Sequence, residues 1–211
     1  MAKSNTNGIC YICGAENSKI VTKNHILKHH NGGDEECFLL TIEGAELPDY
    51  WLIIDVPLEK SLSALDTFLR KIWLECCGHL SEFNDKYNEK VGKARKIREF
   101  DIGDKLYYYY DFGSTTELLV TFVAKTSRPK QKSPVRLLAR NIAPKIKCKN
   151  CGNVAEQICA ECGGAYEDAF YCNDCRKKHK HKTMLPVTNS PRSGECGYTG
   201  EFDVFEYKAN K

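Results

Sequence analysis

The chain has 211 residues, with 31 Lys and Arg against 28 Asp and Glu, a formal net charge of +3 and 42% hydrophobic residues. A chain of this length holds one domain or two, and so small a net charge does not by itself indicate a nucleic-acid-binding protein. No run approaches the roughly 18 apolar residues that a membrane-spanning helix needs, so the composition excludes an ordinary helical membrane protein.

Residues 1–47 are predicted to form an N-terminal zinc finger of the Cys2His2 type, with C-x2-C-x11-H-x3-H spacing. Two histidines at positions i and i+4 share one face of a helix and can bind the same metal ion. His30 and Cys37 are alternatives to the last histidine as the fourth ligand. The predicted ligands are Cys10, Cys13, His25 and His29.

Residues 48–143 are predicted to form an α+β domain, a small sheet packed against a helix. A strand is expected at 50–56, where β-branched and aromatic residues lie between two prolines. A helix is expected to begin at Ser61 or Ser63, because the apolar residues that follow recur at steps of three and four. This apolar stripe consists of Leu62, Leu65, Leu69, Ile72, Trp73 and Cys76.

The rest of this domain is expected to complete the sheet. In the tyrosine run at 107–110, two rings should face inward and two outward, since side chains alternate along a strand. We interpret Cys76 as a packing residue. His79 and Asp111 lack an activating motif, so no catalytic residue is predicted. Further strands are expected at 79–83, 105–110, 118–125 and 135–139.

Residues 144–211 are predicted to form a C-terminal two-zinc module and a tail, with a final strand at 201–207. The run reads C-x2-C-x7-C-x2-C-x9-C-x2-C-x3-H-x-H. A closed structural zinc site takes four nitrogen or sulfur ligands, so eight ligands make two sites. With the N-terminal finger, three zinc ions are expected. The eight ligands are Cys148, Cys151, Cys159, Cys162, Cys172, Cys175, His179 and His181.

Local charge indicates a binding surface that the net charge hides. Residues 118–155 contain no Asp or Glu, a second basic run lies at 90–98, and a third lies inside the zinc module. Such runs are ordinarily solvated surface; the alternative is contact with nucleic-acid phosphates. The candidate phosphate-binding residues are Lys130, Lys132, Arg136, Arg140, Lys145, Lys147, Arg176, Lys177 and Lys178.

Two strings in the middle segment point to a family. They are LSALDTFLRKIWLECCGHLSEF at 62–83 and GDKLYYYYDFG at 103–113. Through them, roughly residues 48–145 resemble the Ri-plasmid ORF-three-like family, some of whose members are labelled insertion-element passenger proteins. The resemblance implies the fold and an association with mobile elements, but no activity. The family often has Asp, Trp and His where this chain has residues 114–118, so no role of those side chains carries over.

The ligand order of the C-terminal run is similar to that of B-box-type cross-brace zinc modules. This resemblance implies that the first and third Cys pairs hold one metal, and that the second pair and the two histidines hold the other. The gap between Cys162 and Cys172 is longer than in typical B-boxes, and one residue separates the histidines. Cys196 is therefore an alternative to one histidine.

We expect a cytoplasmic protein, because residues 1–9 are polar and a secreted disulfide protein normally starts with an apolar signal segment. In a reducing compartment, thiols are held by metal instead of disulfides. The expected function is non-catalytic zinc binding with nucleic acid or a nucleoprotein as partner. The alternative is a protein–protein interaction adaptor. No enzyme is expected, because closed zinc sites leave no open coordination position, and no small-molecule substrate is identified.

Overall fold

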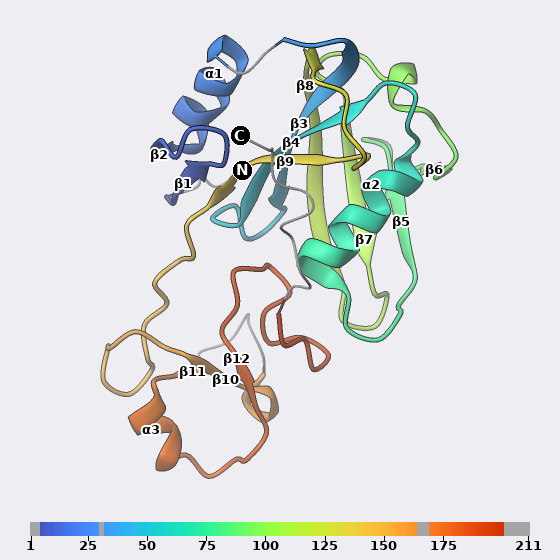
Figure 1. Ribbon diagram of the computed structural model, residues 1–211. Helices are drawn as coiled ribbons and strands as arrows, with labels where there is room; N and C mark the ends of the chain where they lie inside the picture. Colours follow the sequence, from blue (N-terminus) through green and yellow to red (C-terminus); the bar gives the residue numbers. More distant parts are fainter. Residues whose placement is uncertain (1–4, 30–31, 164–168, 201–211) are drawn as a thin grey trace.

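The computed structural model describes residues 5–29, 32–163 and 169–200. A nine-stranded antiparallel sheet forms the larger part, and a three-stranded sheet lies in a smaller lobe beyond one end of it (Figure 1). The predicted mixture of helix and sheet is confirmed, and the large sheet dominates it. Its strands, in spatial order, are β2 (Glu16–Ser18), β1 (Asn7–Cys10), β9 (Arg136–Asn141), β4 (Trp51–Pro57), β3 (Glu35–Gly44), β8 (Thr116–Arg128), β7 (Lys105–Tyr110), β5 (Ser81–Asn84) and β6 (Lys90–Val91).

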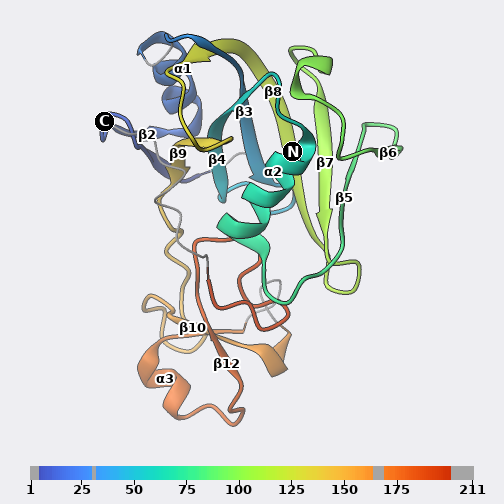
Figure 2. The same cartoon turned by 45° about the vertical axis from the view of Figure 1, so that its right-hand side comes forward.

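One face of the large sheet is covered by helix α2 (Leu62–Leu69) and the π-helical turn η1 (Arg70–Leu74) that continues it (Figure 2). Alternate residues of β3 and β4 point toward this helix, as the two-residue repeat of a strand requires. The apolar stripe predicted for the helix packs here. The main core includes Phe38, Leu40, Ile42, Leu52, Ile54, Leu65, Phe68, Leu69, Ile72 and Trp73.

The opposite face is covered at one edge by helix α1 (Lys19–His29), which carries the histidines of the N-terminal motif. Ile26 of this helix packs on the residues of β3 and β4 that point away from α2. Because helices cover both faces, all seven residues of β4 are buried. This second cluster is made of Cys10, Ile26, Leu39, Trp51, Ile53, Leu138 and Ala139.

The N-terminal segment does not stand apart as the predicted boundary at residue 47 implies. Strand β1 pairs with β9 of the middle segment. Strand β3, which was not predicted, lies between β4 and β8 near the centre of the sheet. The boundary fails because a short finger cannot bury its own apolar surface, whereas the edge of a larger sheet supplies a core for it.

The predicted helix ends earlier than the apolar stripe indicates. After Leu69 the backbone widens into the π turn, and Glu75 is extended (φ −66°, ψ 120°). Cys76 and Cys77 therefore lie in the turn beyond the helix, and strand β5 starts only at Ser81. Cys76 is partly buried and packs against the main core, as predicted, and its thiol also lies 3.9 Å from that of Cys77.

The predicted hairpin is present as β7 and β8, paired from Lys105–Thr121 to Tyr110–Thr116. The tyrosine rings alternate as expected, because Tyr108 and Tyr110 are fully buried while Tyr107 and Tyr109 are partly exposed. Burial raises the pKa of the Tyr108 hydroxyl, which donates a hydrogen bond to Asp66 of α2. The outer half of the sheet is thus tied to the helix above it.

The C-terminal lobe, residues 146–187, is built from short elements around a small core. Its core contains Ile158, Cys159, Ala169 and Tyr171. The strand predicted at 201–207 lies outside the described residues. The elements are β10 (Gln157–Cys159), η3 (Ala160–Cys162), β11 (Phe170–Tyr171), α3 (Asn173–Lys177) and β12 (Met184–Pro186).

After the lobe, the chain comes back to the large sheet through residues 188–198, here called the return segment (Figures 1 and 2). Asn189 exchanges hydrogen bonds with Asn141 at the end of β9, at 2.7 and 2.9 Å. The Trp73 indole donates to the carbonyl of Asn189, and Ser190 donates to the carbonyl of Trp73. The chain thus leaves and rejoins the sheet at one point.

Across the described part of the chain, no helix is long and apolar enough to cross a membrane. The longest is α1, with 11 residues.

Candidate metal centres

Four groups of cysteine and histidine side chains bring their ligand atoms within 4.8 Å of one another. A tetrahedral zinc ion with Zn–S bonds of about 2.3 Å separates its sulfur ligands by about 3.8 Å. Each group has at least three nitrogen or sulfur donors, which are the donors that zinc prefers. All four groups can therefore hold a metal ion.

The first group lies in the C-terminal lobe and has four cysteines: Cys148, Cys151, Cys172 and Cys175. The Cys148 turn is closed by a 3.0 Å hydrogen bond from the amide of Gly152 to the carbonyl of Cys148. Cys172 caps helix α3 by accepting from the amide of Cys175. The Cys151 and Cys172 sulfurs are 3.6 Å apart, close to the edge of a zinc tetrahedron.

The second group also lies in the lobe and has two cysteines and two histidines: Cys159, Cys162, His179 and His181. The Cys162 sulfur is 3.4 Å from His179 Nε2 and 3.2 Å from His181 Nδ1. Both rings reach one point because residues 178–183 form neither helix nor strand. Side chains two residues apart would diverge only on a regular strand.

These two groups interleave along the chain in the cross-brace order that the B-box resemblance implies. The alternative in which Cys196 takes the place of a histidine does not arise here, since its thiol lies with another group. The ring of Tyr171 lies 4.4 Å from the His179 ring, centre to centre, and belongs to the small core against which Cys162 and Cys175 pack.

The third group joins Cys10, Cys13 and His25. The Cys13 sulfur is 3.1 Å from His25 Nε2. His29, the predicted fourth ligand, is not among the atoms within 4.8 Å; its ring centre lies 5.0 Å from that of His25, one helical turn away.

Of the two alternatives to His29, His30 lies outside the described residues, and Cys37 does not join the N-terminal group. Cys37 is fully buried on β3 and donates to the carbonyl of Glu35. Burial raises the pKa of the Cys37 thiol to about 12, which favours the neutral form over a metal-binding thiolate.

The fourth group, Cys76, Cys77, His79 and Cys196, was not predicted. It joins the turn after η1 to the return segment, which are more than 100 positions apart in the chain. One sequence signal could have indicated it. Three of the four knuckle pairs end in Cys-Gly, at 13–14, 151–152 and 162–163, and the same dipeptide occurs at 77–78 and 196–197.

Two of the predicted phosphate-binding residues are not accessible. Arg136 and Arg140 are only 7% and 5% exposed. Arg136 pairs with the buried carboxylate of Asp55, and Arg140 donates to the carbonyl of Asn189. The acid-free run had suggested a basic surface, but strand β9 turns these two side chains toward buried partners, so neither is available to phosphate.

The basic run at 90–98 is also largely neutralised. Lys93 pairs with Asp66, Arg95 with Glu99 and Arg98 with Glu59. By contrast, the remaining candidates are exposed: Lys130, Lys132, Lys145, Lys147, Arg176, Lys177 and Lys178.

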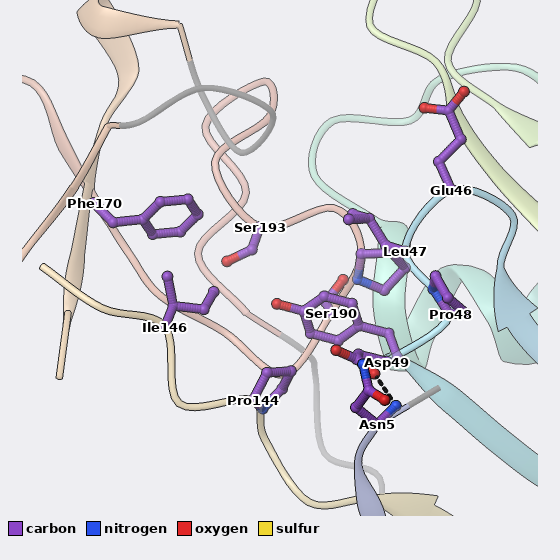
Figure 3. Close-up of a pocket in the computed structure, with 12 residues that line it drawn as sticks. Asn5, Glu46, Leu47, Pro48, Asp49, Pro144, Ile146, Phe170, Ser190 and Ser193 are labelled. Carbon is purple, nitrogen blue, oxygen red and sulfur yellow. Dashed lines mark hydrogen bonds between the residues drawn. The ribbon is translucent and has the colours of Figure 1, made fainter. Parts of the chain in front are cut away.

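A cavity of about 330 Å³ lies where the lobe, the β3–β4 turn and the return segment meet (Figure 3). Its apolar side is made by Leu47, Pro48, Ile146 and Phe170, which point toward the same space. Ser190 and Ser193 supply polar groups from the return segment. No metal-binding group lines this cavity.

Comparison with known proteins assigns no family. No family model and no curated protein matches this chain. A solved structure, the protein of unknown function MM3350 from Methanosarcina mazei Go1, matches with 20% identity and a TM-score of 0.44. The match covers 50% of this chain and 69% of that chain.

Proposed function

We propose that the protein is a non-catalytic zinc protein whose C-terminal lobe binds nucleic acid or a nucleoprotein. The observation that carries the proposal is a set of exposed cations around the Cys2His2 group of the lobe. They are Lys149, Arg176, Lys177, Lys178, Lys180 and Lys182.

Three of these cations share a concave surface. A pocket of about 250 Å³ is lined by Arg176, Lys177 and Lys182 together with the two histidines of the second metal group. Cations that converge on one hollow create a stronger local field than the same charges spread over a surface. Such a site suits a phosphate backbone, which is a row of closely spaced negative charges.

Few described carboxylates oppose this surface. Asp174 pairs with Lys177 at 3.0 Å, and both are largely exposed, so solvent screens the pair. Glu161 accepts a hydrogen bond from the amide of Thr183 instead of pairing with a lysine. Lys178, Lys180 and Lys182 have no carboxylate partner among the described residues and remain available to phosphate.

Zinc serves as scaffold in this proposal. Four nitrogen and sulfur ligands close a tetrahedral site and leave no position for water or substrate. The two groups of the lobe each have four such ligands. They would hold the short strands and α3 in place, so that the lysines have fixed positions.

The test is fluorescence anisotropy of the full chain with labelled duplex DNA, single-stranded DNA and RNA at rising salt. Binding should weaken steeply with salt, and replacing Arg176, Lys178 and Lys182 by alanine should lower the slope by about one for each lost phosphate contact. The matched control replaces three exposed lysines of the sheet domain: Lys60, Lys86 and Lys105. Equal slopes for the two triple variants, or no binding at low salt, would contradict the proposal.

A second candidate function is protein–protein interaction, and the cavity of Figure 3 favours it. Its prolines and aromatic ring form an apolar surface with hydrogen-bonding groups at the rim, which suits a short peptide segment of a partner. Purification of the protein from its native host separates the two functions. A salt-resistant protein partner without nucleic acid would support the adaptor.

The resemblance to the Ri-plasmid ORF-three-like family remains a prediction.

A further inference from the structure

Three thiols and one imidazole meet at the junction of the sheet domain and the return segment. The Cys76 and Cys77 sulfurs are 3.9 Å apart, and the Cys77 and Cys196 sulfurs are 3.8 Å apart. His79 Nε2 lies 2.9 Å from the Cys77 sulfur and 3.1 Å from that of Cys196. The sulfur–sulfur distances match the edge of a zinc tetrahedron of about 3.8 Å, and a disulfide would require about 2.05 Å.

The backbone around these thiols repeats a feature of the other metal groups. Gly78 and Gly197 follow Cys77 and Cys196, with φ of 83° and 70°. Gly14 and Gly152 follow the second cysteines of two knuckles, with φ of 79° and 76°. A left-handed glycine lets the chain turn sharply behind a ligand. The fourth group thus shares this glycine turn with two of the predicted knuckles at both of its contributing segments.

A buried cation stands next to the group. Arg192 is fully buried, and its guanidinium donates to the Cys76 sulfur at 3.6 Å and to Asp111 at 2.6 Å. Three thiolates around one Zn²⁺ leave a charge of −1, which a neighbouring guanidinium stabilises. His79 Nε2 also lies 3.3 Å from Asp111 Oδ2, but that carboxylate already forms an ion pair with Arg192.

We propose that Cys76, Cys77, His79 and Cys196 hold a fourth zinc ion, which fastens the return segment to the sheet domain. Binding releases the protons of the three thiols to solvent, and no bond in the chain is oxidised or reduced. The zinc adds an anchor to the hydrogen bonds that Asn189, Ser190 and Arg192 already make with the sheet domain, and together they fix how the C-terminal lobe sits on the sheet.

The test counts zinc by native mass spectrometry of the full chain, purified without chelator in the presence of zinc. The wild type should carry one zinc more than Cys196→Ser and Cys77→Ser. Cys37→Ser removes a cysteine outside every group and should keep the wild-type count. His79→Cys exchanges nitrogen for sulfur as the fourth donor and should also keep it.

Hydrogen exchange is a second measurement, because replacing a thiol that binds no metal would not change the exchange rates of the return segment. In Cys196→Ser, the amides of 189–198 should exchange faster, whereas those of 35–43 in β3 should match the wild type. Should the cysteine variants fail to fold, alkylation of the folded wild type decides. Cys76, Cys77 and Cys196 should be protected until a chelator is added. Equal zinc counts for wild type and Cys196→Ser, unprotected thiols, or a Cys77–Cys196 disulfide would overturn the proposal.

Discussion

The guanidinium of Arg192 donates a 2.6 Å hydrogen bond to the carboxylate of Asp111, 81 positions earlier in the chain. Arg192 is fully buried. Its Nη1 donates to the carbonyl of Ser114 and the hydroxyl of Thr116, whereas its Nη2 donates to Asp111. The side chain of Arg192 thus packs into the turn between β7 and β8 and neutralises the Asp111 carboxylate. A buried charge that loses its partner is strongly destabilising, and this contact therefore has a measurable consequence.

We expect Arg192→Met to lower the free energy of unfolding by roughly 3–5 kcal/mol, because it leaves the Asp111 carboxylate buried without a cation. Urea unfolding followed by circular dichroism measures the change. Asp111 has a φ of 64°, and asparagine tolerates this conformation well. The double variant Arg192→Met with Asp111→Asn should therefore be less destabilised than the single variants predict by addition. Strict additivity would show that the two side chains do not interact.

Asp66 should make stability depend on pH. Burial raises the pKa of its carboxyl, but hydrogen bonds from Ser81, Lys93 and Tyr108 outweigh burial and hold the pKa below the usual value. A lowered pKa means that the folded state favours the ionised form. Its stabilisation is complete above the unfolded value of about 3.9 and is lost as pH falls through the folded value.

We therefore expect the stability difference between wild type and Asp66→Asn to shrink as pH falls from neutral to below 4 in urea unfolding. Loss of zinc at acid pH affects both proteins and cancels in the difference. Asp101→Asn, at an exposed position, is the control. A difference that stays constant over this pH range would show that the hydrogen bonds to the Asp66 carboxylate do not lower its pKa.

Gly8 should not tolerate a side chain, although it lies in a strand. A Cβ at this position would lie 2.5 Å from the carbonyl oxygen of Arg140 and closer still to the indole of Trp51, which is fully buried. We expect Gly8→Ala to destabilise by about 1–3 kcal/mol, as overpacking does. Gly92→Ala is the matched control, because a Cβ there meets nothing within 4 Å, and its effect should stay within about 0.5 kcal/mol. Similar melting temperatures for the two variants would contradict this.

Chelation should unfold the C-terminal lobe before the sheet domain. The lobe packs on Ile158, Cys159, Ala169 and Tyr171, a core too small to offset the loss of conformational entropy on folding. The sheet domain has a large apolar core of its own. Hydrogen exchange with a strong zinc chelator should show fast exchange at 157–186 while 105–125 stay protected. Simultaneous loss of protection in both regions would show that zinc also holds the sheet together.

Local patterns in the chain account for much of the fold. The apolar run at 50–56, the stripe that starts at Leu62 and the alternation at 107–110 each match an element of the structure. These signals are local, since they depend on the period of a strand or a helix. Strand β3 escaped prediction because it is attached in sequence to the cysteine–histidine motif, and its pairing with β4 and β8 is a long-range event.

The metal-binding residues divide in the same way. Pairs at C-x2-C spacing come from one turn of backbone, so the amino-acid sequence alone identifies Cys10, Cys13 and the pairs of the lobe as knuckles. The fourth group combines two segments that neither length nor spacing relates, and only the return of the chain at Asn189 brings them together. The burial of Arg136 and Arg140 is likewise a result of packing.

The knuckles, the helix stripe and the hairpin follow from local residue patterns, because each depends on residues a few positions apart. Folding of the whole chain brings the N-terminal motif into the large sheet and places Cys196 next to Cys77. It also decided which cations of the acid-free run stay exposed. Strand pairing and burial join segments that are far apart in the chain, and no local spacing encodes such contacts.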